Sequence, residues 1–338
     1  MVAWLQRQWA STTIWHVLLI PLSWLFFSIT RLRRLAYNLH LLTTHQLPVP
    51  VIVVGNISVG GTGKTPLVIY LAQQLRNHGW QPGIISRGYG GTAVAPTAVH
   101  ADSNALIVGD EPLLIARRTG SPLWVYHNRP AAARALLAAH PQVNVIISDD
   151  GLQHYSLARD INIAVIDGAR GFGNMRLLPA GPLREPLARL DEMDVIVINQ
   201  TGSCHSSIPA RLPNYAMHLQ GHQFTQLINP QHTATAQDFV HQSVHAVAGI
   251  GNPQRFFDQL SAMGLTVVPH AFPDHYQYQP DDLNFSDSNL SAIIIMTEKD
   301  AVKCHSFTNE RMWVWAVDAQ LPDTFIADIL TQLGNHHG

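Results

Sequence analysis

Residues 50–65 constrain the fold most, because they place a glycine-rich loop between a short strand and a helix. The run PVIVV at 50–54 is rich in β-branched residues and predicts a buried strand, and the loop GNISVGGTGKT at 55–65 follows it directly. The pattern PLVIYLAQQLRNHG then predicts a helix that ends near Gly79. This order of elements is typical of a nucleotide phosphate loop, in which backbone N–H groups converge on the β-phosphate.

Within the loop, the residue types assign separate roles. We expect Lys64 to reach the β- and γ-phosphate oxygens and the Thr65 hydroxyl to bind Mg²⁺. The predicted ATP-binding residues are Ser58, Val59, Gly60, Gly61, Thr62, Gly63, Lys64 and Thr65. The loop departs from the pattern GxxxxGK[ST] at one position, because Ser58 stands where the first glycine is expected.

The choice between ATP and GTP depends on a later strand. A GTPase is expected to read its base with Asn-Lys-x-Asp, but the run DVIVI is followed by Asn199-Gln200-Thr201-Gly202, which has neither the Lys nor the Asp. ATP is therefore the predicted nucleotide.

A second apolar run ends in paired carboxylates. VNVIIS at 143–148 is followed by Asp149 and Asp150, and in phosphate-loop enzymes an acidic residue at a strand end helps to hold Mg²⁺. The alternative is an Asp-Asp-Gly turn with no metal. We predict that Asp149 and Asp150 join Thr65 at the metal site.

The most lipid-like segment is TTIWHVLLIPLSWLFFSIT at 12–30, with arginines on both sides. His16, Pro21 and Ser23 interrupt an apolar run that is already short for a span. Half of the eight tryptophans lie in or beside it, and tryptophan favours the headgroup level: Trp4, Trp9, Trp15 and Trp24. We expect a monotopic helix at the cytoplasmic membrane surface; a single span and a core helix are the alternatives. A signal peptide is disfavoured because no small-residue cleavage site follows.

Charge is distributed unevenly along the chain. The formal net charge is −2, but residues 1–101 contain seven Lys or Arg and no acidic residue, so this third of the chain is expected to face something anionic. The overall balance does not predict nucleic-acid binding. Only two cysteines occur, Cys204 and Cys304, and neither has a CxxC neighbour, so the sequence indicates neither a disulfide framework nor a cysteine-based zinc site.

The order of elements predicts an α/β fold. Strand-like runs near 50–54, 82–86, 122–126, 143–148, 161–166 and 194–198 alternate with helical patterns, which indicates a mostly parallel sheet of the phosphate-loop NTPase type. A second α/β set begins near residue 215. The predicted organisation is a membrane-associated helical segment at 1–45, a phosphate-loop nucleotide domain at 46–212 and a smaller α/β lobe at 213–338.

Eight motifs in order resemble those of the tetraacyldisaccharide 4′-kinases of lipid A biosynthesis. They are GNISVGGTGKTP, SRGYGG, GDEPLLIA, SDDGLQH, LLPAGPLREP, GIGNPQRFF, FPDHY and MTEKDAVK, and the resemblance runs from about residue 10 to about residue 305. The family has serine at the position of Ser58. The resemblance implies that ATP phosphorylates the 4′ hydroxyl of a tetraacylated glucosamine disaccharide 1-phosphate at the cytoplasmic face of the inner membrane.

The resemblance also implies catalytic roles. Asp110 and His275 would form the base, and Arg184 and Glu185 match the family's active-site pair, in which the arginine stabilises transition-state charge. Asp110 and His275 fall in different predicted domains, so catalysis would require closure across the cleft. A membrane-surface ATPase switch without a small acceptor is the alternative function, but such proteins have a lysine where this chain has Val59. Neither a nucleic acid nor an obligate protein partner is expected.

Overall fold

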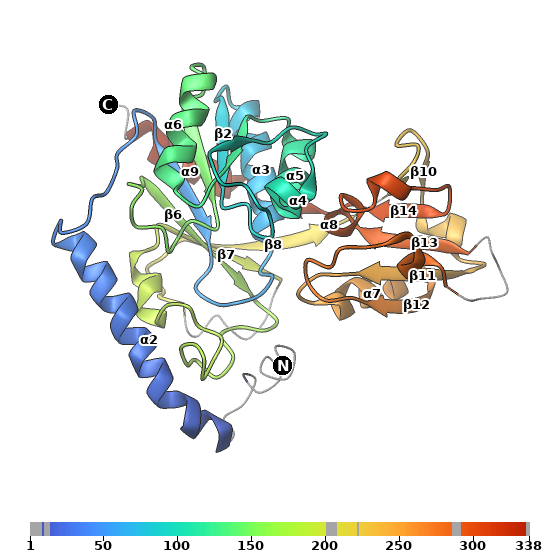
Figure 1. The fold of residues 1–338 in the computed structure, drawn as a ribbon, viewed down its shortest axis with the longest axis horizontal. Helices are drawn as coiled ribbons and strands as arrows, with labels where there is room; N and C mark the ends of the chain where they lie inside the picture. The colour runs from blue at the N-terminus through green and yellow to red at the C-terminus, as the bar shows by residue number, and fades with distance from the viewer. Residues whose placement is uncertain (1–8, 10–13, 201–207, 222, 286–291, 336–338) are drawn as a thin grey trace.

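The fold consists of two lobes joined near helix α8 (Glu298–Ala301) (Figure 1). The computed structural model describes residues 9, 14–200, 208–221, 223–285 and 292–335. Trp4, Arg7, Thr201, Gly202 and Cys204 lie outside the described residues.

The first lobe is built on a nine-stranded sheet. Its spatial order is β15 (Asp318–Gln320), β8 (Asn214–Gln220), β7 (Val195–Asn199), β6 (Ile161–Asp167), β1 (Val51–Gly55), β5 (Val145–Asp149), β2 (Pro82–Ser86), β4 (Leu123–Val125) and β3 (Thr97–Ala98). The strands from β8 to β4 are parallel, and the two edge strands are antiparallel to their neighbours. The six strands predicted from sequence are confirmed, as is the mostly parallel sheet.

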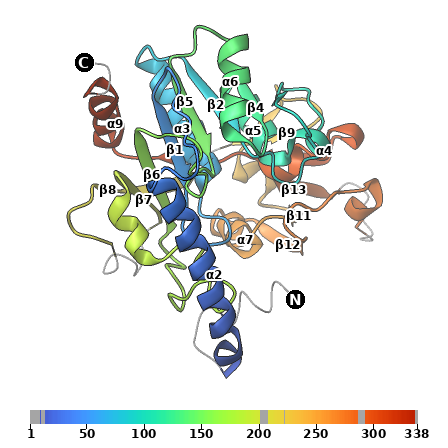
Figure 2. The same cartoon turned by 60° about the vertical axis from the view of Figure 1, so that its left-hand side comes forward.

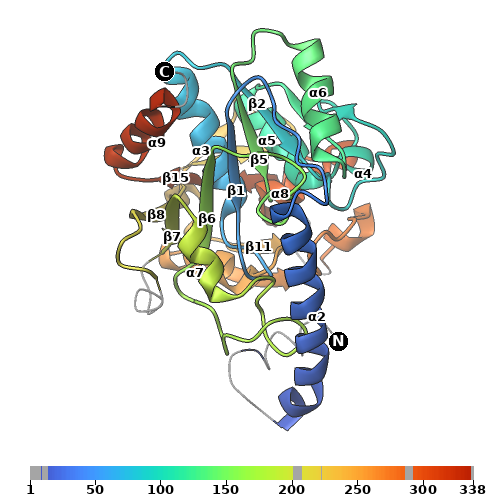
Figure 3. The same ribbon diagram turned by 90° about the vertical axis from the view of Figure 1, so that its left-hand side faces the viewer.

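Helices cover both faces of this sheet, as parallel strands require. Along β1, Ile52 and Val54 face one core and Val51 and Val53 face the other, because side chains alternate across a strand. The first core includes α3 (Lys64–Asn77), α5 (Asp110–Thr119) and α9 (Asp323–Asn335). The second includes α6 (Arg129–Ala139) and the short helix η1 (Leu187–Glu192). Figure 3 shows α9 beside α3 on one side and α6 on the other.

The second lobe contains a six-stranded sheet. Its order is β10 (Thr233–Ala234), β9 (Phe224–Gln226), β14 (Met312–Trp315), β13 (Ile293–Thr297), β11 (Ser243–Ala248) and β12 (Thr266–Ala271). The four strands from β14 to β12 are parallel, and α7 (Pro253–Ala262) packs on β11 and β12. This sheet provides the predicted second α/β unit.

The predicted boundary at 212/213 differs from the structure. β8 continues the first sheet by pairing in parallel with β7, and β15 returns from the second lobe to pair with β8. α9 then packs into the first core, where Phe325, Ile329 and Leu333 are fully buried. The second lobe is therefore an insertion between β8 and β15, because the apolar face of α9 finds its partner on the first sheet.

Helix α2 (Ile14–Asn38) lies along the outside of the first lobe (Figure 2). It contacts the body through a narrow face: Ser23 Oγ donates to Leu177 O at 2.9 Å and accepts from Ala180 N at 3.0 Å. The opposite face is apolar and exposed over residues 18–32. Among the described residues, no helix has both the length and the apolar character needed to cross a bilayer.

The return of α9 to the first lobe predicts a stability effect. Phe325 is fully buried, with ring centroids 5.3 Å from Tyr215 and 6.1 Å from Tyr70. We expect Phe325→Ala to lower the free energy of unfolding by about 3–5 kcal/mol in a urea titration, because it leaves a cavity in the core. Thr324→Ala, next to it on the exposed face, should change it by less than about 0.5 kcal/mol. Equal effects of the two substitutions would show that α9 is not part of this core.

Candidate active site

The phosphate loop has a backbone conformation with positive φ at two of its glycines. Gly60 and Gly63 have φ of 97° and 95°, a region that side chains rarely adopt. A Cβ on Gly63 would also lie 2.5 Å from Asn199 Nδ2, which donates to Thr62 O at 3.0 Å. Asn199 ends β7, which lies two strands from β1 in the sheet, so a second strand end braces the loop. Lys64 begins α3 directly after this bend.

The first half of the loop pairs with the segment that contains Arg184. Val59 N donates to Pro182 O at 2.8 Å, and Arg184 N donates to Ile57 O at 2.7 Å. The N–H of Val59 is therefore already bonded within the protein, unlike the phosphate-binding amide that the sequence predicts there. The same pairing places Arg184 beside the loop.

Asp149 and Asp150 stand at the end of β5, next to β1, and have different surroundings. Asp150 lies 3.5 Å from Lys64 Nζ and 3.2 Å from Arg184 Nη1, and these cations lower its pKa although its burial opposes the shift. Asp149 accepts from Ser86 Oγ at 3.0 Å, while its buried Oδ1 has no hydrogen-bond partner. The structure thus brings together four predicted site residues: Lys64, Asp149, Asp150 and Arg184.

The unpaired oxygen of Asp149 fits a cation. Burial, with the negative charges of Glu111 and Asp150, raises the pKa of Asp149 to about 6. Mg²⁺ commonly uses one or two carboxylates and completes its shell with water and phosphate oxygens. Within the described ranges, no group of three or more His, Cys, Asp or Glu residues could hold a metal ion. The site residues therefore suit an Mg²⁺ ion whose remaining ligands come from a nucleotide.

Asp110 and His275 meet across the two lobes. His275 Nδ1 lies 3.0 Å from both carboxylate oxygens of Asp110. Asp110 is the buried first residue of α5, and its Oδ1 also accepts from Glu111 N at 2.9 Å. The ring of Tyr89, from the SRGYGG segment, lies 4.9 Å from the ring of His275. The predicted association of these two residues is therefore present in the geometry.

Charged groups around Asp110 and His275 shift the pKa values of both residues. The hydrogen bond to Asp110 raises the pKa of His275 despite partial burial. Burial would raise the pKa of Asp110, but the bond from His275 and the charges of Lys299 and Lys303 keep it below its usual value. Lys299 Nζ donates to Glu111 in the first lobe at 2.8 Å and to Asp274 in the second at 2.9 Å. The sequence pattern gave no role to these two lysines.

Glu185 has its oxygens occupied by the protein. Its Oε1 accepts from Gln153 Nε2 at 2.7 Å, and its Oε2 accepts from Tyr155 OH at 3.1 Å and Arg189 Nε at 2.8 Å. Gln153 also donates to Asn56 O in the phosphate loop. The buried carboxylate thus connects the segment of Arg184 to the loop.

The second lobe also touches the phosphate loop. Arg255 Nη2 on α7 donates to Asn199 Oδ1 at 3.2 Å, and a Cβ on Gly251 would lie 3.2 Å from Gly61 N. Sequence reasoning did not identify Asn199 and Arg255 as site residues. The GIGNPQRFF motif, which contains Gly251 and Arg255, was the available signal.

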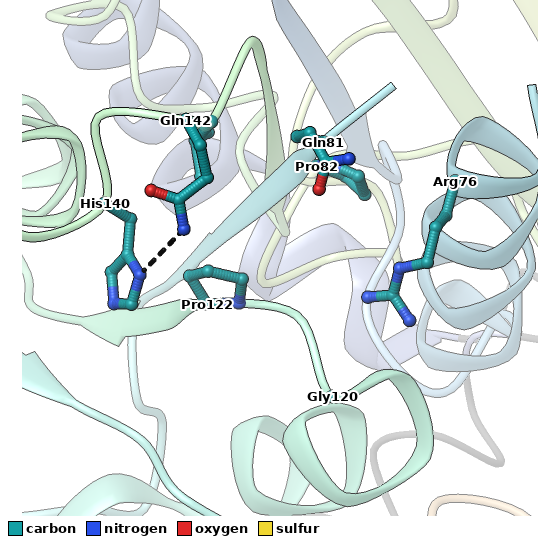
Figure 4. Close-up of a pocket in the computed structure, with 8 residues that line it drawn as sticks. Arg76, Gln81, Pro82, Gly120, Pro122, His140 and Gln142 are labelled. Atoms are coloured by element: carbon teal, nitrogen blue, oxygen red, sulfur yellow. Dashed lines mark hydrogen bonds between the residues drawn. The ribbon is translucent and has the colours of Figure 1, made fainter. Parts of the chain in front are cut away.

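A cavity of about 380 Å³ lies away from this site (Figure 4). Gln81, Pro82, Pro122 and Val143, which line it, precede or begin β2, β4 and β5. The cavity is therefore at the amino-terminal edge of the sheet, whereas ligands of such sheets bind at the carboxyl edge.

Comparisons with known proteins show the family of this chain. A family model described as tetraacyldisaccharide-1-P 4′-kinase matches residues 15–334. The tetraacyldisaccharide 4′-kinase of Methylobacillus flagellatus is 51% identical over 98% of this chain and 96% of its own length. That of Nitrosococcus oceani is 50% identical over 97% and 93%. The crystal structure of LpxK from Aquifex aeolicus in complex with ATP matches with a TM-score of 0.78 and 29% identity, covering 96% of this chain and 99% of that one.

The different surroundings of the two aspartates predict opposite effects on stability. The raised pKa of Asp149 means that its ionisation costs stability as the pH rises from about 4 to about 6, and the full cost is present above that range. In buffer without nucleotide or Mg²⁺, Asp149→Asn should increase the free energy of unfolding by about 3 kcal/mol at pH 8, and the gain should disappear near pH 4.

Asp150→Asn is the matched control. The pKa of Asp150 is lowered, so its ionised form contributes stability above the ordinary carboxyl range, and the substitution should destabilise the protein at pH 8. Denaturant titrations over this pH range measure both. Destabilisation by Asp149→Asn at every pH would contradict the raised pKa that we assign to Asp149.

Proposed function

Since this chain belongs to the tetraacyldisaccharide-1-P 4′-kinase family, it is an ATP-dependent kinase of lipid A synthesis, and we propose how its residues divide the work. The reaction transfers the γ-phosphoryl group of ATP to the 4′ hydroxyl of a tetraacylated disaccharide 1-phosphate. The observation that supports this assignment best is the contact between Asp110 and His275, which can accept a proton. Asp110 comes from the lobe that contains the phosphate loop, and His275 comes from the other lobe.

The first task is to bind and neutralise the phosphates. Residues 60–65 supply loop amides and the helix α3 amino terminus, and Lys64 and Arg184 supply positive charge. Asp149, Asp150 and Thr65 would hold Mg²⁺, which neutralises phosphate charge when bound. Arg184 reaches the same carboxylate as Lys64, so it is placed to stabilise charge on the transferred group.

The second task is to take the proton of the acceptor hydroxyl. With its Nδ1–H donating to Asp110, His275 keeps a lone pair on Nε2. The ionised Asp110 orients the ring and stabilises the imidazolium that forms when Nε2 accepts the proton. Glu185 serves a different purpose in this proposal: it fixes the Arg184 segment through Gln153, Tyr155 and Arg189 rather than reacting itself.

We also propose that α2 attaches the protein to the cytoplasmic surface of the inner membrane. Leu18, Leu22, Leu25, Ile29 and Leu32 recur at three- and four-residue spacing, and each is more than half exposed. Trp24 is 67% exposed on the same helix, and arginines follow the apolar run. An apolar stripe with flanking cations supports interfacial binding to an anionic membrane.

The activity is tested directly by mass spectrometry of the lipid acceptor. Incubation of the disaccharide 1-phosphate with the enzyme and Mg-ATP should add one phosphate to the lipid. Without the lipid acceptor, the rate of ATP hydrolysis should be close to zero. Lys64→Ala should lower transfer by at least about 10²-fold while the melting temperature stays close to that of the parent. Equal ATP hydrolysis with and without the acceptor would favour the ATPase switch.

The proposed base predicts a non-additive double substitution. Asp110→Ala and His275→Ala should each lower kcat by about 10²-fold or more with little change in KM for ATP, and the double variant should lose little beyond the worse single one. The raised pKa of His275 places the acidic limb of the kcat profile above pH ~6.5, and the limb should vanish in His275→Ala. Multiplicative losses, or a limb that persists, would mean that the residues act separately.

The membrane proposal predicts a selective loss of lipid binding. Leu22→Glu with Ile29→Glu puts two charges on the exposed stripe and should reduce sedimentation with anionic vesicles at least about 10-fold without unfolding the protein. Ala138→Glu with Thr324→Glu adds the same charge at exposed positions on α6 and α9 and should leave binding near the parent value. Similar losses in both double variants would indicate nonspecific charge repulsion instead.

A further inference from the structure

Lys303 is a buried cation to which the mechanism above assigns no part. The chain contains only three lysines: Lys64 in the phosphate loop, Lys299 between the lobes, and Lys303. The side chain of Lys303 is fully buried, in the second lobe just after α8. An ammonium group removed from water is costly unless it has ionic partners, so its neighbours indicate why it is there.

Two carboxylates share this ammonium group. Lys303 Nζ donates to Asp300 Oδ1 at 2.8 Å and lies 4.0 Å from Asp110 Oδ2, the oxygen that also bonds to His275. Asp300 already accepts from Gly249 N, Thr297 Oγ1 and Tyr278 OH. Lys303 and Asp110 carry opposite charges 4.0 Å apart, and the charge of Lys303 is among the causes that lower the pKa of Asp110.

The ring of Tyr278 completes the setting. Its centroid lies 5.0 Å from Lys303 Nζ, and its hydroxyl donates to the same Asp300 oxygen as Lys303, at 3.1 Å. Lys303 is thus held in one position, close to the carboxylate of a residue from the other lobe.

We propose that Lys303 is a positioning residue for the base: its ammonium group is the buried counter-ion that keeps Asp110 ionised and oriented toward His275. This inference rests on the proposed base function of the Asp110–His275 pair. It gives the second lobe two contributions to catalysis, the imidazole of His275 and the charge that fixes its partner.

The charge of Lys303 acts on both members of the pair in the same direction. A nearby cation favours ionised Asp110 and disfavours protonated His275, so neutralising Lys303 should raise both pKa values. The other ionisable groups that face the pair or Lys303 are all retained when Lys303 alone is changed: Tyr89, Glu111, Asp274, Tyr278, Lys299, Asp300 and Cys304. The acidic limb of the kcat profile should therefore move to higher pH.

The kinetic test compares neutral and charged replacements in the full-length enzyme. Lys303→Gln keeps a donor for Asp300, Lys303→Met keeps the apolar stem, and Lys303→Arg keeps the charge. In the two neutral variants the limb should move up by about 0.5–1 pH unit, so kcat on the limb falls roughly 3- to 10-fold while the alkaline plateau changes less than about 3-fold. Lys303→Arg should stay near the parent limb. A uniform loss at every pH in the neutral variants would overturn the proposal. No loss at any pH would reject the positioning role, and the titration below then shows whether the counter-ion or the base has failed.

An NMR titration of the Asp110 carboxyl in the unmodified protein tests it without relying on a variant that must fold. The carboxyl should titrate below the ordinary value of ~3.9, and titration at or above that value would overturn the counter-ion role. The same titration of Lys303→Gln separates the two proposals. A raised Asp110 pKa with an unchanged kcat profile would uphold the counter-ion and reject the base, whereas an unchanged pKa would reject the counter-ion alone.

Discussion

The ionic contact between α5 and the second lobe is the interaction on which the active site depends. Asp110 begins α5 and bonds to His275, and Glu111 bonds to Lys299, which also holds Asp274 beside His275. On the same helix, Arg118 donates to Glu298 at 2.7 Å. Three contacts along α5 thus accompany the placement of one imidazole against one carboxylate. A buried ion pair is by itself weak evidence for added stability, so we assign these contacts a role in geometry.

The first lobe supplies the other half of the site through its sheet. The carboxyl ends of β1, β5 and β7 share one edge of the sheet. The phosphate loop follows β1, Asp149 and Asp150 stand at the end of β5, and Asn199 ends β7. Burial raises the pKa of Asp149 and leaves one of its oxygens unpaired, whereas Asp150 is neutralised by two cations. The ionised form of Asp149 therefore lowers the stability of the folded protein. A buried carboxylate with an unpaired oxygen is expected where a protein binds a cation.

The local amino-acid pattern was enough to predict the elements that are specified by residues close together in the sequence. The strand runs, the loop before Lys64 and the acidic end of β5 are contiguous, and all were identified. Three features depend on contacts between distant segments: β8 joining the first sheet, α9 returning to it, and Lys303 approaching Asp110. Apolar periodicity shows that α9 has a buried face but not which sheet covers it, and the pattern of β8 does not show that it pairs with β7. The predicted range 213–338 therefore groups both elements with the second lobe. The pairing of Asp110 with His275 came from family resemblance, since 165 residues separate them.

The account is tested most directly by a double-substitution cycle across the joint between the lobes. Glu111→Gln removes one partner of Lys299 in the first lobe, and Lys299→Gln removes the cation that also holds Asp274. If these charges act together to position the base, each substitution lowers kcat, and the double variant is no slower than Lys299→Gln alone within about 2-fold. Losses that multiply in the double variant would show that the two residues act independently, and would contradict the central role given to this contact.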